Sequence, residues 1–279
     1  METDEQYRTP FERDQAAFDM SRASIARAYD AVIGGKDNFE PDRQWADELT
    51  SIHPSIAELA LSGRRWLVRT VGYLADRCGM DQFLDIGSGL PTVQNTHEVA
   101  QRYQPSAHVV YVDNDPAVTA FEQALLNSAS GHTAFSAADL TNPAEVLADP
   151  AVGGLDWHHP VVMLQCLTMH HVPDELDPWS IMRDYIDALP RGSYVVFSHL
   201  SNPGDGSVAA EIAHAMSAAF ADSDFATGYF RSPTEIEAMT EGLELLEPGL
   251  VPLETWWPSG PRELSASDPV PLGGVGYKP

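Results

Sequence analysis

The chain has 279 residues and a formal net charge of −25, from 16 Lys and Arg against 41 Asp and Glu. Such a charge repels a phosphate backbone at long range, which argues against DNA or RNA as a partner. No stretch approaches the roughly 20 apolar residues of a membrane span and no signal segment opens the chain, so we expect a cytoplasmic protein without a membrane partner. In that compartment Cys78 and Cys166 are expected to be reduced thiols.

The N-terminal part of the chain has a helical pattern. We expect residues 1–80 to form a loosely ordered polar tail and a helical cap, and residues 81–279 to form an α/β domain that makes one globular unit with the cap. A long helix is predicted over about residues 55–77, where Arg64, Arg65 and Arg69 form the only arginine cluster. A solvated helix face is the simplest explanation of that cluster.

A distinctive string lies in this N-terminal part: Gly34-Gly35-Lys36-Asp37-Asn38-Phe39. Its glycines are explained by a corner that ends one helix and re-aims the chain, with Asp37 or Asn38 capping the next turn. The corner does not explain Lys36, one of two lysines in the chain, or Tyr29 just before it.

The segment over residues 82–91 predicts a buried strand, a glycine loop and then a helix that begins at about Thr92. Asp85 lies at the end of the strand, and Gly87 and Gly89 follow it. This arrangement holds an adenosine-containing cofactor at the carboxyl edge of a parallel sheet, because glycines let the ligand approach the backbone closely.

The loop differs from the dinucleotide fingerprint, which would need a third glycine at position 92. The form acid-x-Gly-x-Gly resembles the first motif of class I S-adenosylmethionine (SAM) methyltransferases, although Pro91 stands where their third glycine is usual. The resemblance implies that Asp85, Gly87, Ser88 and Gly89 contact SAM. A purely structural strand-to-helix turn is the alternative.

Two later strands end in acids. The strand over 108–113 ends in Asp113, whose carboxylate can accept both ribose hydroxyls, and Asn114 after it is a further predicted cofactor contact. Helix capping is the alternative role for Asp113, but Asp115 fits that role better because it directly precedes Pro116. The strand over 133–137 leads to Asp139 and Leu140, where methyltransferases of this class commonly contact the adenine; Asp139 as a helix cap is the alternative.

The remaining elements complete an α/β three-layer sandwich with a Rossmann-like sheet. Strands are predicted over 161–167, with Gln165 as a further cofactor contact, and over 194–200 after a helix at 178–189. Helices at 207–220 and 233–240 and strands at 243–246 and 273–277 follow, with the last strand antiparallel. The loop carrying Trp256 and Trp257 either closes over an apolar substrate or packs on the sheet edge.

Methyl transfer needs a base only for a protonated acceptor. His170 and His171, after the strand at 161–167, are the candidate catalytic bases. In many methyltransferases with a similar His-His-x-x-Asp string one histidine mainly braces the loop, and this resemblance favours the bracing role. His199 is a weaker candidate. No metal site is expected, because His158, His159, His170 and His171 have no Cys or Glu partner at a ligand spacing.

Several strings together resemble one family: residues 24–39 with Pro41-Asp42-Arg43, residues 89–98, residues 111–116 and the terminal residues 273–279. They are similar to the actinobacterial SAM-dependent methyltransferases first catalogued as a domain of unknown function. The resemblance implies a class I methyltransferase fold with its own N-terminal cap and names no substrate. We therefore expect the cap to fold over the SAM site, with Tyr29, Lys36 and Asn38 near the methionine carboxylate or the acceptor.

The function predicted from the sequence is SAM-dependent methyl transfer to a small molecule. A SAM-binding or S-adenosylhomocysteine (SAH)-binding protein without catalysis is the second hypothesis, and a nicotinamide-dependent oxidoreductase is the third. The acceptor and the oligomeric state are left open by the sequence.

Overall fold

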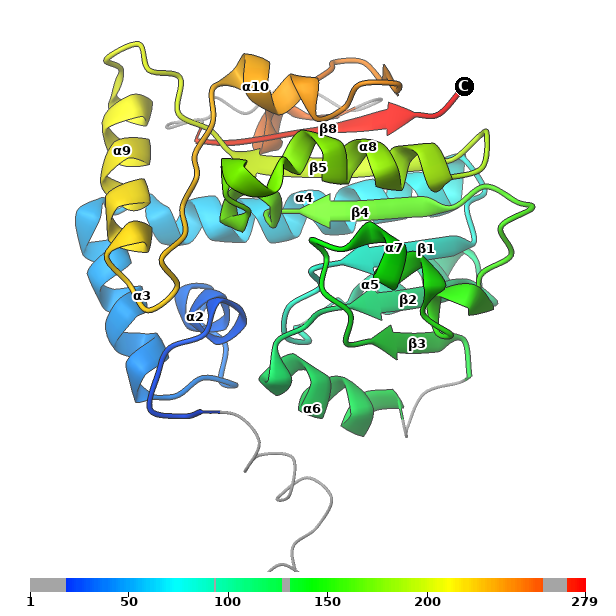
Figure 1. Ribbon diagram of the computed structural model, residues 1–279, viewed down its shortest axis with the longest axis horizontal. Helices are drawn as coiled ribbons and strands as arrows, with labels where there is room; N and C mark the ends of the chain where they lie inside the picture. The colour runs from blue at the N-terminus through cyan, green and yellow to red at the C-terminus, as the bar shows by residue number, and fades with distance from the viewer. Residues whose placement is uncertain (1–18, 93, 127–130, 258–269) are drawn as a thin grey trace, which may run out of the picture.

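An eight-stranded sheet forms the middle layer of the described chain, which in this computed structural model covers residues 19–92, 94–126, 131–257 and 270–279 (Figure 1). The strands run in the order β3-β2-β1-β4-β5-β8-β6, and β7 pairs with β8. Strands β1 to β5 are parallel, and β8 is antiparallel to its neighbours, as predicted for the last strand. Their bounds are β1 Gln82–Ile86, β2 His108–Val112, β3 Thr133–Ser136, β4 Val162–Cys166, β5 Tyr194–Leu200, β6 Glu244–Leu245, β7 Val251–Pro252 and β8 Pro271–Tyr277.

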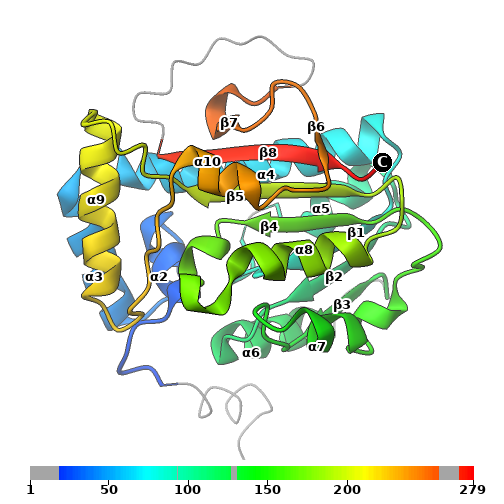
Figure 2. The same ribbon diagram turned by 45° about the horizontal axis from the view of Figure 1, so that its top comes forward.

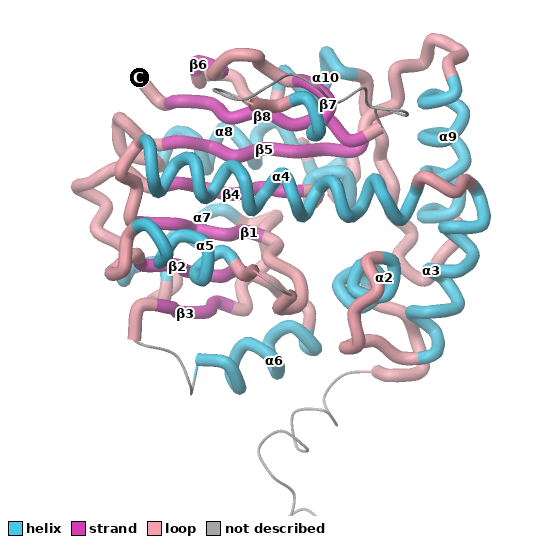
Figure 3. The backbone as a smooth tube through the Cα atoms, turned by 180° about the vertical axis from the view of Figure 1, so that it is seen from behind, coloured by secondary structure: helices cyan, strands magenta, loops and turns pink. Residues whose placement is uncertain are grey.

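Helices cover both faces of this sheet, which confirms the predicted three-layer α/β sandwich. Helices α4 and α5 lie on one face (Figure 3), and α7, α8 and α10 lie on the other (Figure 2). The helices are α2 Ile25–Val32, α3 Glu40–Ile52, α4 Ile56–Arg77, α5 Thr96–Tyr103, α6 Pro116–Leu126, α7 Pro143–Ala148, α8 Pro178–Ala188, α9 Val208–Ala221 and α10 Pro233–Ala238. The described residues also form short 3₁₀ turns in the connecting loops: η2 Val152–Gly154, η3 Met169–His171, η4 Asp174–Leu176 and η5 Leu253–Thr255.

The alternation of side chains along each strand divides the core into two layers. In β1, Phe83 packs with Trp66 and Leu74 of α4, whereas Leu84 and Ile86 face the other layer. All five side chains are fully buried, as expected for a central parallel strand covered on both faces.

Helices α2, α3 and α9 stand beyond the carboxyl ends of the parallel strands (Figure 1). Their contact is aromatic: the Trp45 ring of α3 lies edge-on to Phe220 of α9 at 4.8 Å between centroids and to Phe225 at 4.9 Å. Part of the predicted N-terminal cap thus packs on α9, whereas α4 packs on the sheet itself. The predicted tail spans about the first two dozen residues, of which residues 1–18 lie outside the described ranges.

The helix after the glycine loop begins later than predicted, at Thr96 instead of Thr92. The Asn95 carboxamide oxygen accepts the N–H of Thr92 in the preceding loop at 2.8 Å. Asn95 is also the N-cap of the helix, and its own N–H donates to the side chain of Glu98, the third helical residue, at 2.9 Å as part of a capping box. This capping box fixes the helix start, so the glycine loop continues through Pro91 before the helix begins.

The tryptophan loop packs into the sandwich. Trp256 is fully buried, with its ring edge-on to Trp66 at 6.4 Å and to Tyr73 at 6.2 Å. Of the two alternatives for this loop, packing at the sheet edge is the one that the described residues adopt. The stretch from 258 to 269 lies outside them.

The arginine cluster is a solvated face at only one of its three positions. Arg65 is exposed and pairs with Glu58. Arg69 donates to the carbonyl of Leu253 at 2.6 Å and lies over the Trp257 ring at 4.4 Å. Arg64 faces the functional site described below.

Across the described ranges, every helix is too short or too polar to cross a bilayer.

Candidate functional site

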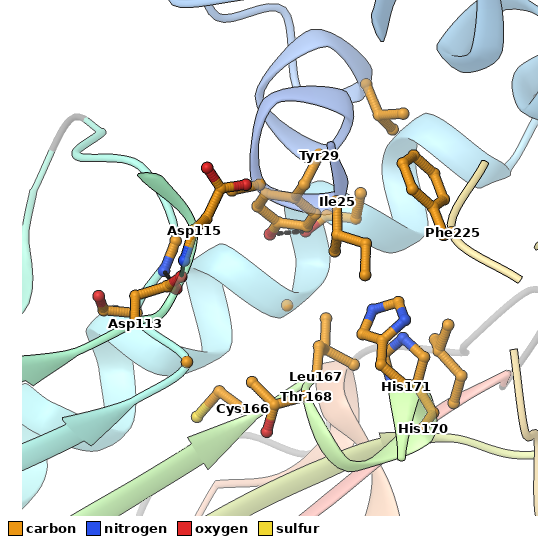
Figure 4. A pocket seen from close by; sticks show the side chains of 18 of the residues that line it. Ile25, Tyr29, Asp113, Asp115, Cys166, Leu167, Thr168, His170, His171 and Phe225 are labelled. Carbon is orange, nitrogen blue, oxygen red and sulfur yellow. Dashed lines mark hydrogen bonds between the residues drawn. The ribbon is translucent and has the colours of Figure 1, made fainter. Parts of the chain in front are cut away.

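A cavity of about 600 Å³ opens at the carboxyl ends of β1, β2 and β4, beneath α2 and α3 (Figure 4). One half is polar and is formed by the glycine loop with Asp113 and Asp115. The other half is apolar and is formed by Leu167, Phe225 and their neighbours from the cap and α9. Tyr29 and Ile25 reach down from α2 between the two halves.

The glycine loop lines the polar half, and each of its glycines has a separate physical reason. Both have left-handed backbones, Gly87 with φ +71° and Gly89 with φ +67°. A Cβ on Gly87 would lie 2.3 Å from Cγ2 of Thr168, so this glycine lets the loop approach the end of β4. A Cβ on Gly89 would meet open space, which is room for a ligand.

Asp85 lies under this loop and is nearly fully buried. Its carboxylate accepts the hydroxyl of Thr96 at 2.6 Å. Burial raises its pKa, while that hydrogen bond and the positive charge of Arg64 act in the opposite direction. Asp85 thus joins the end of β1 to the first residue of α5 and lines the polar half of the cavity.

Asp113 fastens the same loop to the end of β2. Its two carboxylate oxygens accept the N–H groups of Gly89 at 2.8 Å and of Asp115 at 2.9 Å. Burial raises the pKa of Asp113 to about 6, against the lowering effect of both hydrogen bonds. Asp115 accepts the N–H of Ala117 at 2.7 Å and so caps α6, the role expected for it from the sequence.

Other predicted cofactor contacts also line the polar half: Ser88, Asn114, Asp139 and Leu140. The Ser88 hydroxyl is buried and makes no hydrogen bond within the described chain, so a ligand would satisfy it. Asp139 accepts both the N–H and the hydroxyl of Thr141 at 2.8 Å. Asn142 caps α7, so capping does not account for Asp139.

Arg64 is a lining residue that the sequence analysis assigned to a solvated face. Its guanidinium donates to the carbonyl of Gln94, and its charge acts on Asp85. The spacing of residues along this helix could have indicated that Arg64 lines the cavity. Leu59, Gly63 and Leu67 lie four residues apart on one face of the helix, and they line the cavity beside Arg64. An arginine next to such a stripe faces the same space.

The cap is held over the cavity by buried acids. Asp30 accepts the N–H of Asp37 at 2.9 Å and the side-chain amide of Asn38 at 2.8 Å. Asp42 pairs with Arg27 at 2.9 Å, with both side chains almost fully buried. The string Gly34 to Phe39 is therefore mainly a structural corner, and Asp42 rather than Asp37 or Asn38 accepts the first N–H at the start of α3.

Tyr29 lines the cavity, and its hydroxyl donates to the carbonyl of Ala60 at 3.0 Å. Burial raises its pKa to about 12. Phe39, at the end of the corner, packs against Ala117 and Ala120 of α6. The cap thus bridges to the element beside the polar half.

Three predicted cofactor contacts lie outside the cavity lining of the described chain. Lys36 is exposed at the turn between α2 and α3, and the Asn38 side chain is bound to Asp30. Gln165 is fully buried in β4 and accepts the hydroxyl of Thr168; the next residue, Cys166, faces the cavity instead. The period of two along a strand explains this difference.

His170 and His171 line the apolar half from the turn after β4. His171 shares a hydrogen bond between Nδ1 and the Thr227 hydroxyl at 3.0 Å, and burial lowers its pKa to about 4. Burial also lowers the pKa of His170 well below its ordinary value, and its Nδ1 has no partner among the described residues. Both imidazoles are therefore neutral at pH 7.

His199 belongs to the layer behind this turn. Its Nδ1 donates to the carbonyl of Leu200 at 2.7 Å and its Nε2 accepts from Arg231 at 3.1 Å, so it is a neutral imidazole with a fixed tautomer. Burial lowers its pKa to about 3. Both ring nitrogens are occupied, which leaves His199 no atom for proton transfer at the cavity.

Arg231, which the sequence analysis did not identify, holds the histidine turn in place. Its guanidinium donates to the carbonyls of Met169 at 3.0 Å and Val172 at 2.7 Å, on both sides of His170 and His171. It also pairs with Asp174 at 2.6 Å. The turn is braced by this arginine.

Comparison with known proteins gives a consistent result. A family model described as S-adenosyl methyltransferase matches residues 12–279. No curated protein matches the chain. A crystal structure of a methyltransferase candidate from Thermobifida fusca YX is 39% identical, covers 93% of this chain and 96% of its own, and superimposes with a TM-score of 0.85.

A DUF574 family protein from Streptomyces avermitilis MA-4680 is 35% identical over 94% of this chain and 99% of its own, with a TM-score of 0.86. An O-methyltransferase family protein from Burkholderia thailandensis, at 13% identity and a TM-score of 0.52 over all of this chain and 74% of its own, shares the fold. The resemblance seen in the sequence is confirmed, and SAM-dependent methyl transfer is the one of the three predicted functions that these findings support. The chain belongs to the S-adenosyl methyltransferase family.

Proposed function

We propose that this methyltransferase binds SAM in the polar half of the cavity and methylates a small molecule held in the apolar half. The observation that carries the proposal is the continuous cavity itself, which joins a glycine loop with four aspartates to an apolar chamber. SAM supplies a methyl group already activated by its sulfonium, so the protein has to hold donor and acceptor at reacting distance.

The adenosyl part of SAM is assigned to the acids of the polar half. Asp113 accepts the ribose hydroxyls, and Asp139 with Leu140 receives the adenine. The orphaned Ser88 hydroxyl and the open space beside Gly89 support a ligand at the loop. Asn114 completes the proposed ribose side.

The methionine part is assigned to Arg64, Asp85 and Tyr29. Arg64 takes the carboxylate in place of Lys36, because it lines the cavity and bears a positive charge beside Asp85. Asp85 and the loop carbonyls suit the ammonium group. The helices α2 and α3 act as a cap over this half, which is supported by the contact of Phe39 with α6.

A small-molecule acceptor is supported by the position of the chamber under the cap, and by the charge of −25, which disfavours nucleic acid. The two unpaired cysteines and the use of SAM support a cytoplasmic place for the reaction. His171 is the proposed proton acceptor where the acceptor is protonated, since its side chain lines the cavity and Thr227 binds Nδ1 rather than Nε2.

The test is calorimetric titration of SAM and SAH into the full chain, with NADH as a negative control and Arg64→Ala and Lys36→Ala as a matched pair of charge removals. We expect SAM and SAH to bind, Arg64→Ala to weaken both and Lys36→Ala to leave both unchanged. Equal effects of the two substitutions would contradict the assignment of Arg64. Absence of SAH binding by the unaltered chain would contradict the proposed site.

A further inference from the structure

The apolar half of the cavity has a composition that restricts its occupant. Its walls come from elements far apart in the sequence: Ile25 and Val32 of α2, Trp45 and Leu49 of α3, Leu200 at the end of β5, and Met216 and Phe220 of α9. Phe225 closes the side opposite Leu167 (Figure 4). The Trp45 ring lies edge to face with both Phe220 and Phe225, and these two phenyl rings are tilted by 46° to each other at 6.3 Å between centroids. Together the three rings give the chamber an aromatic wall.

Charged side chains of the described lining all belong to the other half. They are Arg64 and the aspartates 85, 113, 115 and 139, grouped around the glycine loop and the ends of β2 and β3. A charged acceptor would therefore lose its hydration in the apolar half without gaining a counter-ion there. Desolvating an unpaired ion costs far more than desolvating a neutral polar group.

The polar side chains at the apolar half include His170 and His171. His170 is only 3% exposed although its Nδ1 has no partner among the described residues, whereas His171 is half-buried and so presents more of its ring to a ligand. Thr227 occupies its Nδ1 at 3.0 Å, and the Phe220 ring lies 5.5 Å from its ring centroid. The imidazole is neutral because burial lowers its pKa to about 4. In the tautomer that has its proton on Nδ1, Thr227 accepts that proton in a hydrogen bond and Nε2 carries a lone pair that accepts a hydrogen bond from a hydroxyl.

We propose that the apolar half binds an uncharged aromatic molecule whose hydroxyl donates to Nε2 of His171 and is the methyl acceptor. The inference rests on the proposed function, because it takes SAM to occupy the polar half. The hydroxyl oxygen forms the new bond to the methyl carbon, the electron pair of the broken carbon–sulfur bond stays on sulfur, and the hydroxyl proton passes to His171 and then to water. SAH, the methyl ether and one proton are the products.

The test separates the acceptor class from the cofactor site. The full chain is first saturated with SAH, and its binding is measured. Phenol, 2-naphthol and a three-ring aromatic alcohol are then titrated by calorimetry beside two charged naphthalene probes, 2-naphthoate and 2-naphthylmethylammonium. At least one neutral alcohol is expected to bind, and the charged probes to bind at least about tenfold more weakly than 2-naphthol.

Three variants test whether the alcohols bind in the apolar half and whether His171 accepts their hydrogen bond. Phe225→Glu, which places a carboxylate in the chamber, is expected to abolish binding of the alcohols, whereas Tyr229→Glu on the neighbouring exposed loop position is the matched control and retains it. His171→Phe is expected to weaken 2-naphthol but not 2-methoxynaphthalene, which has no proton to donate. SAH affinity is measured in each variant and reports whether the fold and the polar half are intact.

The possible results distinguish an error in the acceptor class from an error in the cofactor site. If SAH binds but no neutral alcohol does, or if a charged probe binds as tightly as 2-naphthol, the acceptor class is wrong and the proposed cofactor site stands. If His171→Phe weakens both naphthalenes equally, the hydrogen bond to His171 is wrong. If SAH itself does not bind, the proposed function fails and this inference fails with it.

Discussion

The carboxylate of Asp113 offers the sharpest quantitative test of the cofactor site. It accepts two backbone N–H groups at 2.8 and 2.9 Å, and burial raises its pKa to about 6. Hydrogen bonds to a charged acceptor contribute about 1.5–3 kcal/mol. Asp113→Asn is therefore expected to weaken SAH binding at pH 7 by roughly ten- to a hundredfold.

The raised pKa of Asp113 adds a pH dependence with a definite sign. Below pH 6 the carboxyl is mostly protonated and cannot accept both ribose hydroxyls, so SAH affinity falls as the pH falls. At pH 5 only about a tenth of the sites are ionised, so SAH is expected to bind about tenfold more weakly than at pH 7. Binding should itself lower this pKa, because the ligand donates hydrogen bonds to the charged form.

The assay is calorimetric titration of SAH between pH 5 and pH 7.5. Asp113→Asn is expected to remove most of the pH dependence, and what remains comes from other groups such as Asp85. Asp115→Asn keeps an α6 cap but removes a neighbouring negative charge that raises the pKa of Asp113, so the midpoint should move to lower pH. An unchanged affinity in Asp113→Asn, or the same pH slope as the unaltered chain, would refute the ribose assignment.

Three further predictions concern stability. Gly87→Ala and Gly131→Ala both place an L-residue at a left-handed φ, which costs about 1–2 kcal/mol, but only the Cβ at position 87 meets another atom, at 2.3 Å, whereas the Cβ at position 131 has nothing within 4 Å. Urea unfolding should show the larger loss of unfolding free energy for Gly87→Ala, and equal losses in the two variants would contradict the packing argument. Trp256→Ala should lower the free energy of unfolding by about 3–5 kcal/mol, while calorimetry finds SAH affinity unchanged in protein that remains folded; lost affinity would instead favour a substrate-covering loop. Burial lowers the pKa of His199 to about 3, so its contribution to stability is complete above pH 6.5 and is lost as the pH falls toward 3, by up to about 1.4 kcal/mol per pH unit. His199→Asn should therefore make the free energy of unfolding in urea depend less on pH over that range than it does in the control His214→Gln, which changes an exposed histidine; an equal pH dependence in the two variants would contradict the buried neutral state of His199.

The sheet and the cofactor loop could be predicted from the sequence because their signals are local. A buried strand followed by Asp85, Gly87 and Gly89 fixes the loop within ten residues, and the alternation of apolar strands and helices fixes the layers. Asp113 followed from its place at the end of the next strand. Each of these features depends on neighbours in the chain.

Arg64 and Arg231 could not be assigned in the same way, because their roles depend on tertiary contacts. Arg231 braces carbonyls about sixty residues earlier in the chain. The rarity of lysine in this sequence predicts a role for Lys36, yet rarity carries no information on position, and Lys36 is exposed to solvent in the structure. Gln165 differs from Cys166 by one step along a strand, which reverses the face of the sheet.

The most direct test of the account is a crystal structure of the full chain with SAH bound. We predict the ribose at Asp113, the methionine carboxylate at Arg64 and the sulfur directed toward Leu167 and His171, with the apolar half left open beside it. SAH bound elsewhere, or with its sulfur directed away from the apolar half, would contradict the division of the cavity into a cofactor site and an acceptor site.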